Sequence, residues 1–239
     1  MHAILPLKDL VAAKSRLGGV LRAPERRALM QAMVEDVLAV LAGHAMVESI
    51  TVVSDDPGAA HLCNAFGAAY LDEGSLGCSG LNPVLEATVD TLLASADDPL
   101  MILHGDLPLL AESDVSAVIT AQAATGGVVI GCDRAGTGTN LLAFAAGSRP
   151  RLYFGVDSCA RHQQAAAAVA APSEIVRSPG IGLDVDEPRD ILLLLDGLRE
   201  QTRKSETAAL LIDTPLGRRL ALALDPATVI DIENRKISH

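Results

Sequence analysis

Hydrophobic and polar positions follow two alternating patterns along the 239-residue chain. Short apolar runs, typical of strands buried on both faces, alternate with longer stretches in which apolar residues recur at helical spacing. This alternation predicts an α/β fold with a mostly parallel sheet and helices on both faces. We expect strands at 3–7, 49–54, 69–71, 100–103, 127–131 and 140–144, an extended segment at 181–185, and helices at 24–41, 57–66, 81–95, 112–124, 158–171 and 188–199.

The C-terminal part of the chain has a different pattern. A polar stretch, EQTRKSE at 200–206, separates a domain at 1–200 from a helical extension and tail at 201–239. Within the extension, 207–224 has the pattern of one further helix. The polar tail is interpreted as an appendage that packs on a neighbouring subunit of a homodimer, or alternatively as a partly mobile terminus.

Composition and charge narrow the choice of partners. Hydrophobic residues make up 49% of the chain and aromatic residues 2%, so we expect a core of Ala, Val, Leu and Ile, which suits helices on a parallel sheet. A net charge of −11 argues against nucleic acid and anionic membranes as partners. An anionic substrate therefore requires a local basic cluster or metal ions.

The four cysteines, Cys63, Cys78, Cys132 and Cys159, lie far apart and lack the spacing of a metal site. Since no secretory leader is evident either, the cysteines predict a reducing, cytoplasmic setting in which they are small core or loop residues. No apolar run reaches the length of about 18 residues that a membrane helix requires.

One carboxylate directly follows a buried apolar strand. In LMILHGDLPLL at 100–110, Asp106 comes two residues after the apolar run is interrupted. A buried carboxylate is costly unless a positive group meets it, and open α/β sheets bind ligands at the carboxyl ends of their strands. Asp106 is therefore a candidate site residue. Alternatively, it caps the next helix or begins a turn that Pro108 fixes.

Two segments could contact a nucleotide. The segment after the first strand, PLKDLVAAKSRL, concentrates positive charge in Lys8, Lys14 and Arg16. It is a candidate phosphate-binding segment or a solvated basic turn, and it lacks the P-loop pattern. In GCSGLN at 77–82, the glycines allow a close backbone approach to a ligand, and Asn82 either reads a base edge or caps the next helix.

Two later turns are rich in hydrogen-bond donors. DRAGTGTN at 133–140 places Thr139 in a flexible glycine turn. FGVDSCARH at 154–162 places Ser158 where a helix is expected to begin, with Gly155 shortly before it. Free N–H groups at a helix start suit a phosphate or carboxylate. Two such turns in one domain are stronger evidence than one.

Paired carboxylates occur in GLDVDEPRD at 182–190. In an extended segment, residues two apart point to the same face, so Asp184 and Asp186 are expected to project side by side. Two adjacent carboxylates repel each other unless a cation lies between them, and Mg²⁺ prefers such oxygen ligands. Alternatively, one of the two caps the helix that starts at Pro188.

If the ends of these segments meet, Asp106, Asp184 and Asp186 converge beside Lys14 and Arg16. This constellation suits metal-assisted nucleotidyl transfer, in which Mg²⁺ bridges carboxylates to a nucleoside triphosphate that Lys14 and Arg16 hold. A phosphate acceptor is already ionised at neutral pH, so no catalytic histidine or cysteine is required.

The motifs LPLKDLVAAKSRL, GLN, GDLPLL, DRAGTGTN, FGVDSCARH and LDVDEP, in this order, resemble those of a known family. It comprises the 2-phospho-L-lactate or phosphoenolpyruvate guanylyltransferases of deazaflavin coenzyme F-420 biosynthesis. The resemblance covers most of the predicted domain. It implies a three-layer nucleotidyltransferase fold of the glycosyltransferase-A type. The implied reaction joins GMP from GTP to 2-phospho-L-lactate, phosphoenolpyruvate or 3-phosphoglycerate, with Mg²⁺ and release of pyrophosphate.

The resemblance also implies roles for single residues. It assigns the metal to Asp106 and Asp186 with Asp184 nearby, catalysis to Lys14, Arg16 and Asp106, the nucleotide to Pro6, Lys8, Lys14, Arg16, Gly80 and Asn82, and the phospho-acid to Thr139, Gly155 and Ser158. Glu187 departs from the family pattern because it stands where a threonine is usual, which weakens the helix cap. His104 is expected to pack rather than to act in catalysis.

Two other functions stay open. A related nucleotidyltransferase could act on a sugar phosphate, an alcohol phosphate or a molybdopterin, but those families generally carry a glycine-rich loop where Pro6-Leu7-Lys8 stands. A protein that binds a nucleotide without turnover would not need three acidic groups around phosphates. The sequence leaves the acceptor acid, and the guanine preference beyond the resemblance, undetermined.

Overall fold

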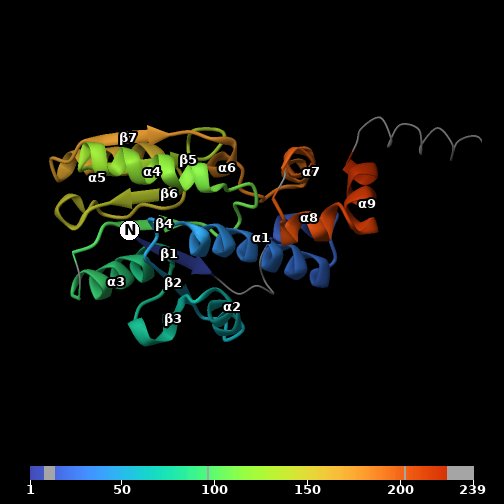
Figure 1. Ribbon diagram of the computed structural model, residues 1–239, viewed down its shortest axis with the longest axis horizontal. Coiled ribbons are helices and arrows are strands. Elements are labelled where there is room, and N and C mark those ends of the chain that lie inside the picture. The colour runs from blue at the N-terminus through green and yellow to red at the C-terminus, as the bar shows by residue number, and fades with distance from the viewer. Residues whose placement is uncertain (8–13, 96, 202, 225–239) are drawn as a thin grey trace, which may run out of the picture.

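The computed structural model describes residues 1–7, 14–95, 97–201 and 203–224 (Figure 1). In these residues seven strands form one sheet, in the order β3-β2-β1-β4-β6-β5-β7. The strands are β1 (His2–Leu7), β2 (Ser49–Ser54), β3 (Ala69–Asp72), β4 (Leu100–Leu103), β5 (Val128–Cys132), β6 (Thr139–Phe144) and β7 (Ser173–Val176). The α-helices are α1 (Ala23–Gly43), α2 (Ala59–Phe66), α3 (Leu81–Leu93), α4 (Glu112–Thr125), α5 (Ser158–Ala168), α6 (Pro179–Gly182), α7 (Pro188–Glu200), α8 (Glu206–Leu211) and α9 (Pro215–Leu224). Short 3-10 helices cover Ser15–Gly19, Glu73–Leu76 and Ala146–Ser148.

Strands β2 and β3 lie on one side of β1 and the later strands lie on the other, so the direction in which the chain adds strands reverses at β1. This strand pairs in parallel with β2 on one side and with β4 on the other, and β6 runs antiparallel to β4 and β5. Open α/β sheets bind ligands at such a switch point, outside the carboxyl ends of the strands. The segments that carry Lys14 and Asp106 follow β1 and β4, so they belong to this edge of the sheet.

Two apolar cores cover the opposite faces of the sheet. Leu5 of β1 packs with residues of α1, α2, α4 and α7, whereas the neighbouring Ile4 packs with residues of α3 and α5. Adjacent strand residues point to opposite faces, so a sheet covered on both sides needs unbroken apolar strands. The predicted three-layer α/β fold with a mostly parallel sheet is thereby confirmed. In the described part of the chain, no helix combines the length and the apolar character needed to cross a membrane.

Most predicted elements are confirmed, and two have their predicted bounds, the strands at 49–54 and 100–103. The prediction for 181–185 is wrong in part, because Pro179–Gly182 forms the short helix α6. The hydroxyl of Ser178 caps this helix by accepting the N–H of Ile181 at 3.1 Å. The edge strand β7 is not among the predicted strands.

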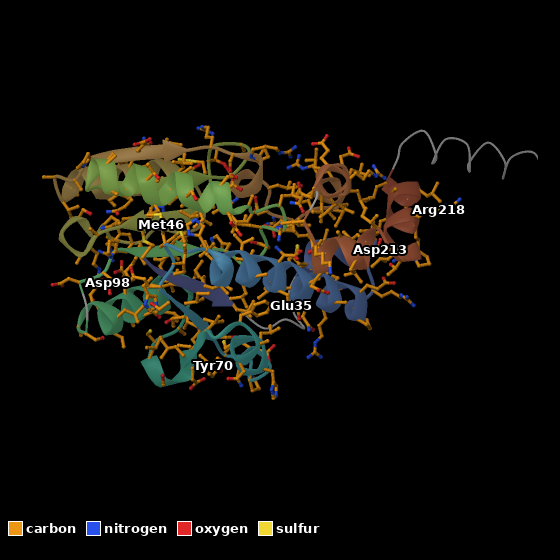
Figure 2. All side chains as sticks on the ribbon, in the orientation of Figure 1. Glu35, Met46, Tyr70, Asp98, Asp213 and Arg218 are labelled. Atoms are coloured by element: carbon orange, nitrogen blue, oxygen red, sulfur yellow. A yellow bond between two sulfur atoms is a disulfide. The ribbon has the colours of Figure 1, made fainter. Side chains whose placement is uncertain are left out.

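The predicted single helix at 207–224 is wrong as well, because the chain forms α8 and α9 there. Pro215 lacks a backbone N–H and starts the second helix. In Figure 2, the labelled Asp213 and Arg218 mark this extension at one end of the molecule, beyond the sheet. The tail for which a subunit contact was predicted, 225–239, lies outside the described residues.

The start of α8 is fixed to α1 by Asp36. This carboxylate is 2% exposed and accepts the hydroxyl of Ser205 at 2.7 Å and the backbone N–H groups of Glu206 at 2.8 Å and Thr207 at 3.0 Å. Such buried hydrogen bonds to a charged group are among the stronger ones in proteins. The extension therefore packs on its own chain, against α1 and α7.

Cys132 at the end of β5 and Cys159 in α5 form a disulfide, with Cα atoms 6.2 Å apart. The prediction that all four cysteines are unpaired core or loop residues is therefore wrong for these two. Their separation of 27 residues gives no sequence signal, and only the packing of α5 against β5 brings them together. Cys63 and Cys78 are free.

Candidate active site

Lys14 joins two carboxylates at the switch point of the sheet. Its ammonium donates hydrogen bonds to Oδ2 of Asp106 and to Oδ1 of Asp186, the latter at 2.6 Å. The side chain of Lys14 is 7% exposed and that of Asp106 is 18% exposed, so water screens this pair little. Residues 92 and 172 positions away from Lys14 in the sequence are thereby brought together.

The charges in this cluster shift one another's pKa. Burial alone would lower the pKa of Lys14, but Asp106 and Asp186 outweigh it, so the pKa lies above its usual value and the ammonium stays charged. Burial alone would raise the pKa of Asp106. Lys14, and after it His104, outweigh that effect and hold the pKa of Asp106 below its usual value. Both groups are therefore ionised at neutral pH.

Asp184 forms no ion pair with a described side chain. Burial raises its pKa, as do the negative charges of Asp106 and, to a smaller extent, Asp186. The amide of Asn140 donates to Oδ1 of Asp184 at 3.2 Å and to the carbonyl of Ile181 at 2.9 Å, which orients the carboxylate without neutralising it. The three aspartates therefore carry more negative charge than Lys14 offsets.

The aspartates suit a divalent cation by their charge and by their oxygen ligands. Among the described residues, however, no group of three or more histidine, cysteine, aspartate or glutamate side chains is arranged to hold a metal ion. The ammonium of Lys14 lies between Asp106 and Asp186 and is hydrogen-bonded to both.

The backbone next to Asp186 is fixed by Asp190. Its carboxylate accepts the N–H of Asp186 at 3.1 Å and the N–H of Glu187 at 2.8 Å, and thereby caps α7. Glu187 stands at the cap position without a side-chain cap hydrogen bond, in line with its departure from the family pattern. The alternative that Asp184 or Asp186 caps this helix is wrong.

The loop that carries Asp106 lies close to α1. A Cβ atom on Gly105 would lie 3.0 Å from the Val34 side chain, so only glycine fits without displacement. The alternative that Asp106 caps the next helix is wrong, because the carboxylate of Asp114 accepts the N–H of Ala111 at the start of α4 at 2.9 Å. Asp106 is thus left to pair with Lys14.

A β-bulge re-aims two neighbouring side chains of β6. Asn140 is an extra residue opposite the Gly131–Cys132 step of β5. As a result, Asn140 reaches Asp184, whereas Thr139 faces α5, where its Oγ1 lies 3.0 Å from Nδ1 of His162. Bulges are common beside active sites for this reason.

The segment before α5 is tied to α3 by Asn82. Its amide donates to the carbonyl of Phe154 at 2.9 Å and accepts the N–H of Phe154 at 2.7 Å. The interpretation that Asn82 caps its own helix is therefore wrong. Gly155 has φ +121°, a conformation that favours glycine, and His104 packs edge-on against the Phe154 ring at 5.3 Å between centroids.

Ser158 is the first residue of α5, as predicted, and is 1% exposed. The expectation of free N–H groups at this helix start is wrong for two of them. The N–H of Ser158 donates to the backbone carbonyl of Gly155 at 3.2 Å, and the N–H of Cys159 donates to the backbone carbonyl of Thr137 at 3.0 Å. An anion here would depend more on side-chain hydroxyls than on these backbone groups.

The other predicted site residues lie further out. Arg16 is 71% exposed and lies 3.9 Å from Glu187. Pro6 lies within β1, and Gly80 precedes α3 with φ +90°. Among these, the described ones form no hydrogen bond or ion pair with the three aspartates. Lys8 lies outside the described residues.

A cavity of about 540 Å³ opens beside Asp184 and Asp186. Its lining combines three arginines with five carboxylates: Arg16, Arg134, Arg189, Asp133, Asp184, Asp186, Glu187 and Asp190. Guanidinium groups bind phosphate oxygens well because of their fork of N–H donors. The lining therefore offers guanidinium groups to phosphate oxygens and carboxylates to a cation.

Three residues at the site are absent from the sequence-based assignment, namely Asn140, His162 and Asp190. His162 lies four positions after Ser158 and so shares its helix face, which is a readable signal. Asn140 directly follows Thr139. Asp190 holds the position at which a capping box places its acidic residue.

Solved structures share the fold. The chain superposes on a structure from Desulfovibrio desulfuricans G20, solved under the name "putative nucleotide-diphospho-sugar transferase", with a TM-score of 0.77 and 18% identity, covering 92% of this chain and 97% of the other. For a 4-diphosphocytidyl-2C-methyl-D-erythritol synthase the TM-score is 0.56 at 15% identity, with 82% of this chain and 98% of the other covered. These likenesses show that the chain shares the fold of both proteins.

The chain belongs to the family described as guanylyl transferase CofC like, which matches residues 1–207. It is 38% identical over 199 residues to the phosphoenolpyruvate guanylyltransferase of Conexibacter woesei, covering 83% of this chain and 86% of the relative. The family and the enzyme class implied by the sequence motifs are confirmed. The protein is a guanylyltransferase, an enzyme of GMP transfer from GTP in coenzyme F-420 biosynthesis.

Proposed function

We propose that phosphoenolpyruvate is the acceptor of the GMP group, with 2-phospho-L-lactate and 3-phosphoglycerate as the other two candidates. The name of the Conexibacter woesei relative supports this order. The observation that carries the proposed mechanism is the position of Lys14 between Asp106 and Asp186, beside the unpaired Asp184. The cluster offers a triphosphate one fixed cation, the Lys14 ammonium. Its excess negative charge is suited to bind a further cation.

In the proposed reaction, an ionised phosphate oxygen of the acceptor attacks the α-phosphorus of GTP. The bond between that phosphorus and the bridging oxygen to the β-phosphate breaks, and pyrophosphate leaves. Lys14 supplies a permanent positive charge next to the reacting phosphate, and Arg16 and the other cavity arginines hold the departing phosphates. No residue needs to remove a proton, because the attacking oxygen is already ionised.

Asp106, Asp184 and Asp186 would hold Mg²⁺ in this mechanism. Their excess negative charge and the raised pKa of Asp184 support this assignment. When bound, the ion supplies neutralisation of the phosphate oxygens that gain charge during transfer. Asn140 and Asp190 keep Asp184 and the Asp186 backbone in place for it.

Thr139, Gly155 and Ser158 are assigned to the acceptor. The two hydroxyl groups are suited to donate hydrogen bonds to its carboxylate or phosphate, and Gly155 leaves the approach free of a side chain. Pro6, Lys8, Gly80 and Asn82 are assigned to GTP, and Gly80 supports this through a backbone conformation that allows close approach to a ligand.

The test is release of pyrophosphate from GTP with each of the three acceptors, with Mg²⁺ present or chelated. We expect release with phosphoenolpyruvate in the presence of Mg²⁺ and none after chelation. Absence of release with all three acids, but release with a sugar phosphate or alcohol phosphate, would contradict the proposed acceptor class.

Asp106→Asn tests the cluster itself. The amide keeps the shape but loses the charge, so we expect turnover to fall at least about 100-fold. Asp213→Asn is the control, because Asp213 is exposed in the turn between α8 and α9, far from the sheet edge (Figure 2). A near-normal rate for Asp106→Asn, with an unchanged unfolding curve, would mean that Asp106 is not part of the reaction.

A cytoplasmic enzyme that forms a homodimer belongs to the same proposal. The scattered cysteines motivate the first part, although the Cys132–Cys159 disulfide argues against a reducing setting, and the C-terminal extension motivates the second. Light scattering of the purified chain tests the dimer, and a monomer mass would contradict it.

A further inference from the structure

His162 is a buried histidine that the mechanism above leaves without a role. It lies on α5, one turn after Ser158, and is 0% exposed. The backbone N–H of Tyr153 donates to its Nε2 at 2.9 Å, and its Nδ1 lies 3.0 Å from Oγ1 of Thr139. The Phe154 ring packs edge-on against it, with centroids 4.9 Å apart. Both ring nitrogens are therefore engaged.

The hydrogen bond from Tyr153 fixes the tautomer of His162. A nitrogen that accepts an N–H carries no proton, so Nε2 is unprotonated. Burial lowers the pKa of His162 to about 4, with smaller contributions from Arg161 and His104, so the ring is neutral at neutral pH. A neutral imidazole has one N–H, which must be on Nδ1. The Nδ1–H therefore donates to Oγ1 of Thr139.

This direction decides what the Thr139 hydroxyl does with its own proton. An oxygen that accepts a hydrogen bond from His162 still carries an O–H, which is free to point elsewhere. In the part of the chain that the structure describes, no other hydrogen-bond partner lies within reach of Oγ1. The free O–H is therefore available to a substrate acceptor, such as a carboxylate or phosphate oxygen.

We propose that His162 is a positioning residue that makes the Thr139 hydroxyl a hydrogen-bond donor to the acidic acceptor substrate. This rests on the proposed function, in which Thr139 contacts that substrate. It adds a source of specificity, because an analogue that presents only an N–H donor in place of the anionic oxygen leaves the Thr139 O–H without its acceptor. Such an analogue would leave a buried polar group unpaired, which strongly lowers affinity.

His162 could instead serve only to hold the chain at Tyr153, and the two hydrogen bonds can be separated by substitution. In His162→Asn, the side-chain NH₂ lies near the position of Nδ1 and can still donate to Thr139. In His162→Gln, the side-chain oxygen lies near the position of Nε2 and can still accept from Tyr153, but the donor to Thr139 is lost. The pair of variants is therefore a matched test.

The experiment measures kcat and both KM values by pyrophosphate release. For His162→Gln we expect the KM of the phospho-acid to rise roughly tenfold, the scale of a lost hydrogen bond to a charged group, with the KM of GTP unchanged. For His162→Asn we expect a rise of less than about threefold. In the Thr139→Val background, His162→Gln should add no further effect, because the hydroxyl that it orients is gone.

A second measurement does not depend on turnover. In ¹⁵N-histidine spectra, the His162 signal, assigned as the one missing from His162→Gln, should show a protonated Nδ1 and an unprotonated Nε2 from about pH 5.5 to pH 8. A protonated Nε2, or a charged ring at neutral pH, would overturn the inference.

The kinetic outcomes separate this inference from the proposed function. If the wild-type enzyme transfers GMP to a phospho-acid but His162→Gln leaves the acceptor KM unchanged, the inference is wrong and the proposed function stands. Greater damage by His162→Asn than by His162→Gln, or additive effects with Thr139→Val, would assign His162 to the support of Tyr153 alone. If no phospho-acid is used, the proposed function and the substrate role of His162 are both overturned.

Discussion

Replacing Lys14 with methionine would remove the cation that Asp106 and Asp186 share. Asp106 would then be a largely buried carboxylate, 18% exposed, without an ion-pair partner. Loss of one partner from a buried pair costs about 3–5 kcal/mol. Asp186 is 47% exposed, so screening by water limits its share to less than about 1 kcal/mol. We expect the free energy of unfolding to fall by about 3 kcal/mol, which lowers Tm by about 6–12 °C.

The size of this loss depends on pH. Burial alone would raise the pKa of Asp106, but Lys14 holds it below the value in the unfolded chain. Pairing therefore stabilises the folded state fully above the unfolded pKa of about 3.9, and the contribution disappears as the pH falls through the lower folded pKa. In Lys14→Met, burial dominates and Asp106 takes up a proton more readily. The difference between the two proteins is thus largest near neutral pH.

Urea unfolding followed by circular dichroism at neutral pH and at about pH 3.5 measures both effects. Lys204→Met is the matched control, because Lys204 is exposed and forms no ion pair among the described residues. Equal stability of the two methionine variants at neutral pH would refute the reasoning. So would a loss of the same size at both pH values.

Three further predictions concern neighbouring groups. Asp184→Asn should raise the free energy of unfolding at neutral pH, because burial and repulsion from Asp106 raise the pKa of Asp184, while pyrophosphate release falls. Asn82→Ala removes two hydrogen bonds to Phe154 and should cost about 2 kcal/mol in urea unfolding, with a higher acceptor KM. Asp190→Ala uncaps α7 and should cost about 1 kcal/mol, with a lower kcat. Unchanged melting curves and kinetics would contradict each one.

Local sequence signals predicted the fold well where an element is long or buried. The strand at 100–103 is apolar throughout and buried on both faces, so its pattern leaves little doubt about its bounds. The strand Ser173–Val176 is short, lies at the edge and is partly exposed, so it lacks that pattern. The break before Pro215 follows from proline chemistry that the apolar periodicity around it obscures.

The site was predictable only in part for a different reason. Asp106 and Asp186 are recognisable because each follows an apolar segment and is an expensive residue to bury. That Lys14 lies between them depends on contacts 92 and 172 residues apart, which no local pattern records. The bulge at Asn140 is equally invisible, because a single extra residue leaves the sequence of the strand unremarkable.

The central claim is that Asp106 and Asp186 meet a divalent cation together with the phosphates of GTP. A crystal structure with Mn²⁺ and a non-hydrolysable GTP analogue, with an anomalous map at the manganese edge, tests it directly. We expect a peak about 2.1 Å from carboxylate oxygens of both aspartates, close to ideal magnesium distances, with the Lys14 ammonium turned to a phosphate. A nucleotide bound elsewhere, or no peak while Lys14 still bridges the two carboxylates, would contradict it.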